Sequence, residues 1–297
     1  MTRPLTGPLA VRLRSFERYF DGVLPAESET PSRLHEAMRY AALAPGKRFR
    51  PLLVLCACEA VGGRWQHALP AGAALELVHA FSLVHDDLPA MDDDDYRRGR
   101  LTTHKKYGEA LGILAGDALI ALAFEELTRL AGQGVPSKRV VAAIEWLAYC
   151  AGSHELIGGQ VLDLQAEGRP VDEAAVEEIH SRKTGGLMSA ALRLGGIVGG
   201  ANAAALERLA AAGHALGLAF QIHDDLLNRG ATLERLGKRT GTDDQRRKAT
   251  YPRAAGEARA RERAAACFAS ATTSLATFGS SSRNLTRLIT AVAQRDH

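Results

Sequence analysis

The sequence predicts an all-α protein, and three features of its patterning and composition support that fold class. Apolar residues recur with the three-to-four-residue spacing of a helix along almost the whole chain. Runs of alternating β-branched residues, which are typical of strands, are absent from the sequence. Alanine and leucine, both strong helix formers, dominate the apolar residues, whereas aromatic residues make up only 5% of the chain.

Glycine, proline and serine breaks divide the chain into apolar-periodic segments, and each segment is predicted to be one helix. The predicted helices are 8–21, 32–44, 50–62, 69–88, 109–131, 137–157, 172–180, 185–199, 203–227, 252–276 and 283–294. The longest polar interruptions, 89–108 and 228–251, are charged rather than of low complexity, so neither resembles an interdomain linker. We therefore predict a single domain spanning residues 1–297.

Charge, hydropathy and cysteine content exclude several classes of protein. The net charge is only +3 and basic residues are interspersed with acidic ones, so we expect no nucleic-acid partner. No run approaches eighteen uninterrupted apolar residues, so we expect no stable membrane insertion. The cysteines are too sparse for a disulfide scaffold and lack zinc-site spacing, so we expect buried free thiols in a cytoplasmic protein. These cysteines are Cys56, Cys58, Cys150 and Cys267.

The predicted helices 69–88 and 203–227 are mostly apolar, and each ends in a His-Asp-Asp triplet. Such apolar helices belong in the centre of a bundle, where adjacent carboxylates resist simultaneous ionisation unless a cation lies between them. Magnesium suits this role because it binds a few carboxylates and completes its coordination with substrate phosphates. The sequence therefore predicts a site for magnesium and diphosphate. Its acidic residues are Asp86, Asp87 and Asp92, in the pattern DDxxxxD, and then Asp224 and Asp225 with Asn228.

Pro89 lies between two of these carboxylates, Asp86 and Asp92. An unbroken helix would direct residues six positions apart toward different sides. Because proline lacks a backbone donor and clashes with the preceding turn, we predict that the helix ends near Leu88. Asp92 can then turn back toward Asp86.

Five ordered blocks of the chain together resemble the head-to-tail trans-prenyltransferases, and in particular the bacterial farnesyl diphosphate synthases. The blocks are Gly46 to Pro51, His79 to Gly99, Lys183 to Gly185, Phe220 to Asn228, and Gly237 to Pro252. The resemblance covers essentially the whole chain, and DDxxxxD followed by Arg-Arg-Gly is typical of the family. It implies an isoprenoid-synthase bundle of about ten to twelve helices around a central cavity, usually in a homodimer.

The resemblance also implies roles for the residues in these blocks. Two or three Mg²⁺ ions are expected on Asp86, Asp92 and Asp224, with Asp87 and Asp225 in support. The allylic diphosphate is expected to contact the catalytic cations Arg97, Lys183 and Lys238, with Thr184, Gln221 and Lys248 nearby. Isopentenyl diphosphate is expected at Gly46, Lys47, Arg50, His79 and Arg98. Without the resemblance, a lone histidine such as His79 is more often a hydrogen-bonded core residue, and His85 and His223 are expected to be structural.

The reaction that the family implies needs no general base from the protein. Magnesium, lysine and arginine stabilise the diphosphate as it leaves the allylic substrate, and the double bond of isopentenyl diphosphate attacks the resulting carbocation. In the family, the residues four and five positions before the first aspartate form part of the floor for the growing chain, here Ser82 and Phe81. A bulky ring at Phe81 resembles enzymes that stop at the fifteen-carbon farnesyl product, although Phe81 can equally serve only to pack between helices.

Alternatives to a farnesyl diphosphate synthase stay open at this point. Geranyl and geranylgeranyl diphosphate synthases share the same motifs, whereas a terpene cyclase is disfavoured because it needs no isopentenyl site. Asn228 replaces the usual final aspartate of the second motif, which predicts weaker magnesium occupancy but retains a carbonyl oxygen. A non-catalytic modulatory subunit is the alternative from another class, although such subunits typically lose an aspartate motif outright.

Overall fold

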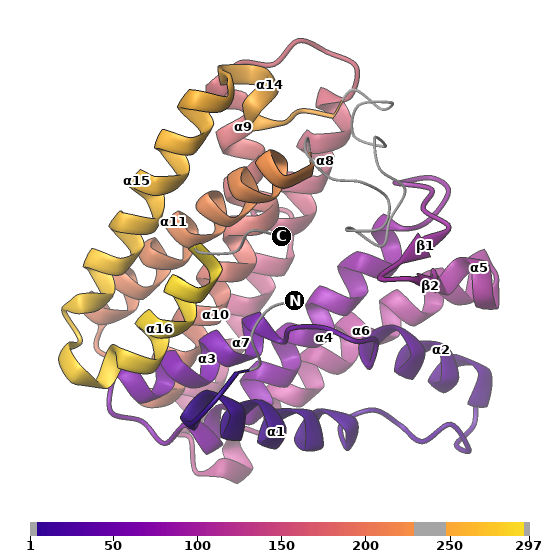
Figure 1. The fold of residues 1–297 in the computed structure, drawn as a ribbon. Coiled ribbons are helices and arrows are strands. Elements are labelled where there is room, and N and C mark those ends of the chain that lie inside the picture. The colour runs from indigo at the N-terminus through magenta and orange to yellow at the C-terminus, as the bar shows by residue number, and fades with distance from the viewer. Residues whose placement is uncertain (1–4, 229–247, 294–297) are drawn as a thin grey trace.

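The computed structural model of the protein describes residues 5–228 and 248–293. Within them, twelve α-helices have eight or more residues, and the all-α prediction is confirmed (Figure 1). These helices are α1 (Pro8–Asp21), α2 (Ser32–Ala42), α3 (Phe49–Ala60), α4 (Leu69–Asp86), α6 (Glu109–Thr128), α7 (Ser137–Ala151), α8 (Leu156–Ala166), α9 (Glu173–His180), α10 (Gly186–Gly199), α11 (Ala203–Asn228), α15 (Glu257–Ala276) and α16 (Arg283–Ala293).

Shorter elements connect the long helices. Two are five-residue α-helices, α5 (Thr103–Tyr107) and α14 (Tyr251–Ala255), and one is a π-helical turn, η3 (Ser181–Gly185). Strands β1 (Tyr96–Arg97) and β2 (Arg100–Leu101) form a small antiparallel hairpin. Three 3-10 turns complete the described elements: η1 (Trp65–Ala68), η2 (Ala131–Gln133) and η4 (Gly279–Ser282).

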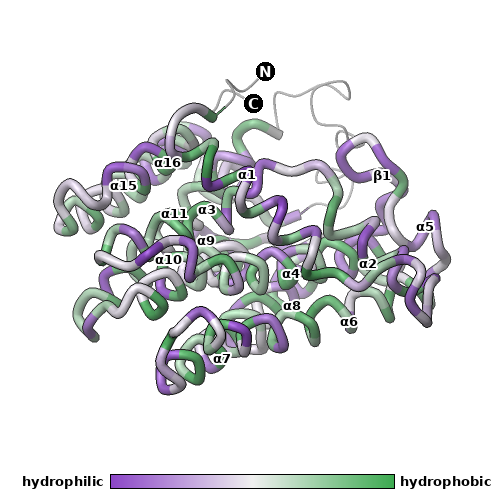
Figure 2. Tube along the Cα trace, turned by 90° about the horizontal axis from the view of Figure 1, so that it is seen from below, coloured by the Kyte–Doolittle hydropathy of each residue, from purple (hydrophilic) through white to green (hydrophobic). Residues whose placement is uncertain are grey.

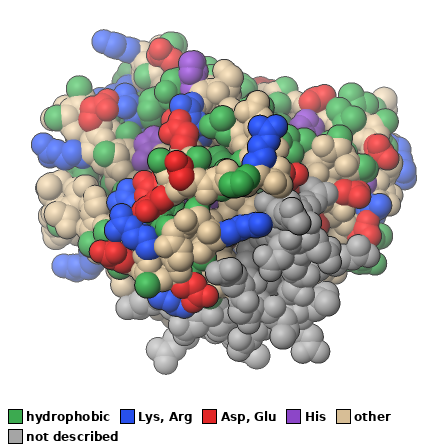
Figure 3. Space-filling view, turned by 90° about the horizontal axis from the view of Figure 1, so that it is seen from above, with side chains coloured by type: hydrophobic (Ala, Val, Ile, Leu, Met, Phe, Trp, Pro, Cys, Tyr) green, Lys and Arg blue, Asp and Glu red, His purple; other side chains and the backbone are tan. Residues whose placement is uncertain are grey.

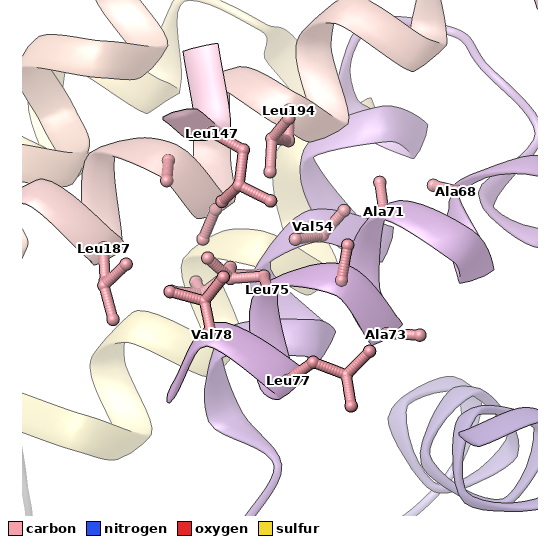
Figure 4. Packing of buried hydrophobic residues seen from close by; sticks show 14 of the residues in the cluster. Val54, Ala68, Ala71, Ala73, Leu75, Leu77, Val78, Leu147, Leu187 and Leu194 are labelled. Carbon is pink, nitrogen blue, oxygen red and sulfur yellow. The ribbon is translucent and has the colours of Figure 1, made fainter. Parts of the chain in front are cut away.

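Helices α4 and α10 lie inside the bundle and are buried around most of their circumference. All but two of the 14 residues of α10 are buried, which fits a helix surrounded by α3, α7 and α11. The apolar side chains of α3, α4, α7 and α10 meet in one core, in which Leu75 and Val78 pack near Leu147 and Leu187 (Figure 4). The outer helices alternate polar and apolar segments along the trace (Figure 2). The apolar pattern of 69–88 therefore correctly predicted a central helix.

The second helix predicted to be central, 203–227, behaves differently along its length. The first half of α11 carries exposed residues such as Glu207 and Arg208, whereas Leu216, Ala219 and Ile222 in its second half are buried. Only the half that leads to the second aspartate motif is therefore a core helix.

Two of the predicted helices are wrong in their boundaries. The predicted helix 137–157 ends at Ala151, because Gly152 takes an extended conformation, and a new helix, α8, begins at Leu156. The predicted helix 252–276 is divided by Gly256, which has a φ of 84° that favours glycine. The helix α8 extends to Ala166, through residues that the sequence pattern left unassigned.

Among the described residues, one helical stretch, Trp65–Asp86, is long and apolar enough to cross a membrane by length and composition. Of its most apolar window, 78% is buried inside the protein, as expected for a core helix that meets the same test. All four cysteines are free and buried, as predicted, and burial raises the pKa of the Cys56 thiol to about 12. On the face seen from above, acidic and basic side chains lie next to one another, in keeping with the interspersed charge of the sequence (Figure 3).

Candidate functional site

The chain turns back on itself directly after α4, at the break that Pro89 predicted. The helix ends at Asp86, and the backbone amide of Asp92 donates a hydrogen bond of 2.7 Å to the Asp86 carbonyl. The amide of Asp93 donates to the carbonyl of Leu88 over 3.0 Å, and Asp93 itself has a left-handed φ of 47°. The predicted return of Asp92 to Asp86 is therefore confirmed.

The Asp86 carboxyl lies where charges from several segments meet. Burial raises its pKa, Lys183 opposes that effect, and the neighbouring Asp92 carboxylate adds to it. Arg97 and Lys248 also lower the Asp86 pKa through their positive charges. Residues from α4, the β1–β2 hairpin, η3 and the segment before α14 thus converge around one carboxylate.

The β1–β2 hairpin carries the two arginines that follow the first motif. Arg98 and Gly99 form its two-residue turn, with φ values of 53° and 74°, the left-handed pair typical of a tight hairpin. Arg97 Nε donates to both oxygens of Asp87, at 2.7 and 2.9 Å, and Asp87 is only 3% exposed. Burial lowers the pKa of Arg97, but the hydrogen bonds and charge of Asp87 raise it overall. Asp87 therefore fixes the Arg97 guanidinium.

Arg98 points from the same turn toward the loop before α3. Its Nη1 donates to the Pro45 carbonyl over 2.9 Å, and a Cβ added to Gly46 would lie 2.8 Å from that nitrogen. Glycine at position 46 therefore leaves the space that Arg98 occupies. The predicted isopentenyl residues Gly46 and Arg98 come together here from different blocks of the sequence.

Arg50 and His79 meet beside this loop. Arg50 Nη1 lies 3.4 Å from His79 Nε2, and burial lowers the pKa of both side chains. The positive charges of Arg50 and Arg98 lower the His79 pKa further, to well below its usual value. His79 is therefore a neutral imidazole at physiological pH. Lys47 lies in the same loop, between Gly46 and Arg48.

Arg48, inside the block Gly46 to Pro51, has a structural role. It is 8% exposed, has a left-handed φ of 46°, and donates from Nη1 to Glu76 Oε1 over 2.8 Å. It also donates to the carbonyls of Ala42 and Ala44. The buried pair of Arg48 and Glu76 thus anchors the loop between α2 and α3, and sequence patterns gave no sign of Glu76.

The second motif holds its leading carboxylates differently. Asp225 is 5% exposed, and both of its oxygens accept from the protein: Oδ1 from Gln221 Nε2 at 3.2 Å and Oδ2 from the Tyr251 amide at 2.9 Å. His180 Nε2 also lies 2.8 Å from Oδ2. Gln221 in turn accepts from the Thr184 hydroxyl over 2.8 Å. Asp225 therefore joins α9, α11 and α14, while its predicted role toward magnesium stays a prediction.

Asp224 is half-buried one residue earlier on α11, and its charge raises the pKa of Arg50 against the larger effect of burial. The ring of Phe220 stacks near Phe49, with ring centroids 6.3 Å apart, so this part of α11 lies against the start of α3. Asn228 is the last residue of α11. Lys238, predicted to contact the allylic diphosphate, lies outside the described residues.

One short segment bridges the two aspartate motifs. Lys248 Nζ donates to Asp92 Oδ1 over 2.7 Å, and three residues later the Tyr251 amide donates to Asp225. The Tyr251 side chain is fully buried, and its hydroxyl lies within hydrogen-bond distance of the carboxylates of Glu173 and Glu177 on α9. The segment is thus fixed at Tyr251 and extends Lys248 to the first motif.

Lys183 and Thr184 lie in η3, the π-helical turn between α9 and α10. Lys183 Nζ donates to Asp163 Oδ2 on α8 over 2.7 Å, a partner that sequence patterns did not identify. A Cβ on Gly217 would lie 2.4 Å from the Cα of Gly185, so glycine allows α11 to approach this turn closely. The turn therefore presents Lys183 and Thr184 between α8 and α11.

The two predicted floor residues lie on different sides of α4. At about 100° per residue, Ser82 lies about 40° from Asp86 around the helix, and Phe81 about 140° away. The Phe81 ring meets His85 edge to face, with 5.0 Å between ring centroids, and His85 Nε2 lies 3.1 Å from the Ile113 carbonyl on α6. Both floor residues are buried, and His85 has the structural contacts that we expected.

The carboxylates of the site fit a magnesium ion that is bound together with the substrate and not by protein ligands alone. Among the described residues, no three His, Cys, Asp or Glu side chains gather into a metal site of their own. Asp86 and Asp92 are nevertheless close enough for one carboxylate to raise the pKa of the other. Because Mg²⁺ typically takes one or two carboxylates and completes its octahedron with water and phosphate, this pair suits a metal bound together with a diphosphate.

Comparisons with known proteins agree with this site. The sequence profile of the family described as polyprenyl synthetase matches residues 31–277. A dimethylallyltranstransferase from Fischerella ambigua is 45% identical over 90% of this chain and 77% of its own length. A chloroplastic geranylgeranyl pyrophosphate synthase from Catharanthus roseus is also 45% identical, over 82% of this chain and 67% of its own.

Solved structures show the same fold over nearly the full length. An FPP/GFPP synthase from Zymomonas mobilis superposes with a TM-score of 0.82 at 36% identity, covering 96% of both chains. A geranyltransferase from Helicobacter pylori, in complex with magnesium and isoprenyl diphosphate, has a TM-score of 0.83 at 30% identity over 98% of both chains.

Proposed function

The chain belongs to the polyprenyl synthetase family, and we propose that it is a magnesium-dependent synthase that condenses isopentenyl diphosphate with dimethylallyl or geranyl diphosphate to give farnesyl diphosphate. It is a prenyltransferase, and the short-chain prenyl diphosphate synthases are the group that its relatives and structural neighbours represent. Magnesium dependence and the farnesyl product are the parts that the proposal adds.

One observation carries the proposal: the carboxylates of Asp86 and Asp92 face the cationic side chains of Lys183, Arg97 and Lys248. A diphosphate carries several negative charges that both a metal on the carboxylates and these cations can neutralise. Carboxylates and cationic side chains that surround one site suit an anion bound through a metal better than a neutral substrate. The known complex of the Helicobacter pylori relative contains magnesium and isoprenyl diphosphate, which supports the same assignment.

In this mechanism the protein stabilises the charge of the leaving diphosphate. Magnesium, held by Asp86, Asp92 and Asp224, would supply positive charge against the diphosphate oxygens. Lys183 and Arg97 add charge-assisted hydrogen bonds, and Asp87 keeps the Arg97 guanidinium in a fixed orientation. The bond between the allylic carbon and oxygen then breaks, and both electrons leave with the diphosphate.

The second substrate needs only to be held with its double bond beside the carbocation. We assign its diphosphate to Lys47, Arg50 and Arg98 at the loop before α3. The neutral His79 imidazole beside Arg50 can donate or accept a hydrogen bond without adding charge. The new carbon–carbon bond forms from the double bond, and a proton then leaves to the released diphosphate, which restores a neutral hydrocarbon chain.

Two product lengths are candidates: the fifteen-carbon farnesyl chain and the twenty-carbon geranylgeranyl chain. Buried Phe81, five residues before Asp86 on α4, supports a floor that stops the chain at fifteen carbons. The twenty-carbon geranylgeranyl product is the second candidate, because a relative with that name is 45% identical to this chain over 243 aligned residues. Phe81 packs against His85, about 140° around α4 from Asp86. A floor formed by Ser82 without the Phe81 ring would give the second candidate.

We also propose that the protein is a homodimer. Five large apolar side chains on two helices are exposed, an unusual number for a surface without a partner. They are Ile113 and Leu114 on α6, and Ile157, Val161 and Leu164 on α8. Helix α7 contacts both α6 and α8, so the three helices form one side of the molecule. Light scattering of the purified protein should give twice the chain mass, and a mass of one chain would contradict the proposal.

The function is tested by incubating the purified protein with Mg²⁺, labelled isopentenyl diphosphate and dimethylallyl, geranyl or farnesyl diphosphate in turn. Products are dephosphorylated and separated by chain length. The proposal predicts a farnesyl product from the two shorter primers and little extension of farnesyl diphosphate. Efficient extension of farnesyl diphosphate would identify the twenty-carbon candidate, and no extension of any primer would contradict the enzyme assignment.

A Phe81→Ala variant sharpens the assignment of product length. If the ring forms the floor, its removal should shift the main product to twenty carbons or more. Val84→Ala is a matched control, because Val84 is buried on the same helix and is not part of the predicted floor. Unchanged products from Phe81→Ala would mean that the Phe81 ring does not set the product length.

A further inference from the structure

Helix α8 contacts the candidate site through one narrow face. Its buried residues Gly159, Gln160 and Asp163 recur at the spacing of a helix face that points into the protein. A Cβ added to Gly159 would lie 2.4 Å from the backbone nitrogen of Lys183 and 2.8 Å from its Cα. Glycine at this position therefore lets α8 touch the η3 turn at the residue that carries the ammonium.

One turn further along α8, Asp163 receives that ammonium. Lys183 Nζ lies 2.7 Å from Asp163 Oδ2, and the two side chains are 23% and 12% exposed. Water competes little for a pair that is shielded to this degree, so the interaction holds the flexible lysine chain in one place. An ammonium has three donors, and the bond to Asp163 leaves two of them for a substrate.

The position that Asp163 selects for Lys183 lies opposite the first aspartate motif. Among the charges that lower the pKa of Asp86, Lys183 has the largest effect. The ammonium is thus held between Asp163 on α8 and Asp86 on α4. A diphosphate that bridges the motif through magnesium would meet the ammonium from the side opposite Asp163.

We propose that Asp163 is a positioning residue that directs Lys183 at the allylic diphosphate, with Gly159 setting the distance between α8 and the η3 turn. The inference rests on the proposed synthase function and adds two residues to it. Asp163 does not touch the reacting atoms. It acts through Lys183, by fixing where positive charge lies when the diphosphate leaves.

Two other roles for Asp163 make different predictions. If its negative charge only repelled the diphosphate, Asp163→Asn would tighten allylic substrate binding and leave kcat unchanged, and Asp163→Glu would resemble the wild type. If Asp163 only stabilised the fold, its effect would not depend on Lys183. Positioning predicts instead that both variants are slow, because Asp163→Glu keeps the charge but moves its oxygens by about the length of one carbon–carbon bond.

The test measures steady-state kinetics with Mg²⁺, isopentenyl diphosphate and dimethylallyl diphosphate for Asp163→Asn, Asp163→Glu, Lys183→Ala and the double variant Asp163→Asn with Lys183→Ala. We expect Asp163→Asn to lower kcat roughly 30- to 100-fold, since a misplaced catalytic group can cost about 10²-fold. The KM for isopentenyl diphosphate should stay within about twofold of the wild-type value, because the substitution does not change the residues assigned to that substrate. The double variant should be no slower than Lys183→Ala within about threefold, because coupled residues are not additive.

Glu167→Gln is the matched control, because it removes the same charge four residues after Asp163, directly past the end of α8, and Glu167 has no role in the site. It should retain wild-type kinetics, and thermal unfolding should show all variants folded at the assay temperature. Losses that multiply in the double variant, or a fast Asp163→Asn, would overturn the inference while the wild type still elongates. A wild type that fails to elongate would overturn the proposed function and the inference with it.

Discussion

The two aspartate motifs carry similar residues, but the protein holds their carboxylates in different ways. In the first motif, Asp86 makes no side-chain hydrogen bond to another described residue, and Asp92 accepts a hydrogen bond from the ammonium of Lys248. In the second, Asp225 accepts from a backbone amide and a glutamine side chain and lies against His180. In the proposed function, Asp86 and Asp92 would therefore change partners on binding a metal and diphosphate, whereas Asp225 would keep its partners.

This difference suggests separate roles for the two neighbouring aspartates of each motif. Within each motif, one carboxylate is tied to the protein: Asp87 to Arg97, and Asp225 to the Tyr251 amide. The residue just before it, Asp86 or Asp224, is the one to which the proposed function assigns magnesium. In the proposed function, each pair of adjacent aspartates would therefore consist of one metal ligand and one supporting residue, as in the outer partners of known metal sites.

Replacing Asp86 by asparagine should produce the largest effect. The substitution removes the negative charge that magnesium needs, so we expect kcat/KM to fall at least about 10³-fold, or about 4 kcal/mol of transition-state stabilisation. Asp95→Asn is the control within the same acidic run, because Asp95 pairs with the exposed Lys105 at 2.8 Å. Equal losses in both variants would mean that the acidic run acts through its total charge and not through Asp86.

Replacing Asp87 by asparagine should have a smaller effect of a different kind. The Arg97 guanidinium would lose its charged partner but not its place in the hairpin, so we expect a loss of activity of about 10- to 100-fold. The half-saturating Mg²⁺ concentration should change little if Asp87 is a supporting residue. A large increase in that concentration, measured by titrating the metal at saturating substrates, would make Asp87 a ligand.

Replacing Asp225 by asparagine should affect stability before activity. An asparagine amide cannot accept on both sides, so one buried donor among the Tyr251 amide, His180 and Gln221 would lose its partner, at about 2 kcal/mol. Urea unfolding of wild type and variant measures this difference. A variant of unchanged stability that has lost its response to Mg²⁺ would show that Asp225 binds metal and that the contrast between the motifs is wrong.

Restoring aspartate at position 228 should give the smallest change. The added carboxylate strengthens metal binding at the end of α11, so the half-saturating Mg²⁺ concentration is expected to fall by about two- to fivefold, within the range of supporting metal contacts. The maximal rate should remain the same. A metal requirement identical to that of the wild type would show that Asn228 already supplies a sufficient ligand.

The features that the sequence predicted best are those decided by local pattern. Helical spacing identified the core helix α4, and Pro89 correctly predicted the turn that returns Asp92 to Asp86. Helix α8 escaped prediction because Gly158 and Gly159 lower helix propensity. Glycine is needed at 159 because the η3 turn approaches it from another part of the chain, and that contact leaves no local signal.

The partners of the candidate site residues were beyond local pattern for the same reason. Asp225 lies 45 residues from His180 and 26 from Tyr251, and Lys183 lies 20 residues from Asp163. Each partner is an ordinary polar residue whose role depends on how helices pack. Motifs could name the residues that touch substrate in related enzymes, but only the fold could name the residues that orient them.

The most direct test of the account is the affinity of the wild-type protein for inorganic diphosphate, measured by calorimetry with and without Mg²⁺. If the aspartate motifs hold diphosphate through the metal, Mg²⁺ should tighten binding at least about tenfold, or about 1.4 kcal/mol. Asp86→Asn should remove most of that gain, whereas Asp95→Asn should retain it. Equal affinity with and without Mg²⁺ would contradict the central claim that these carboxylates bind substrate through magnesium.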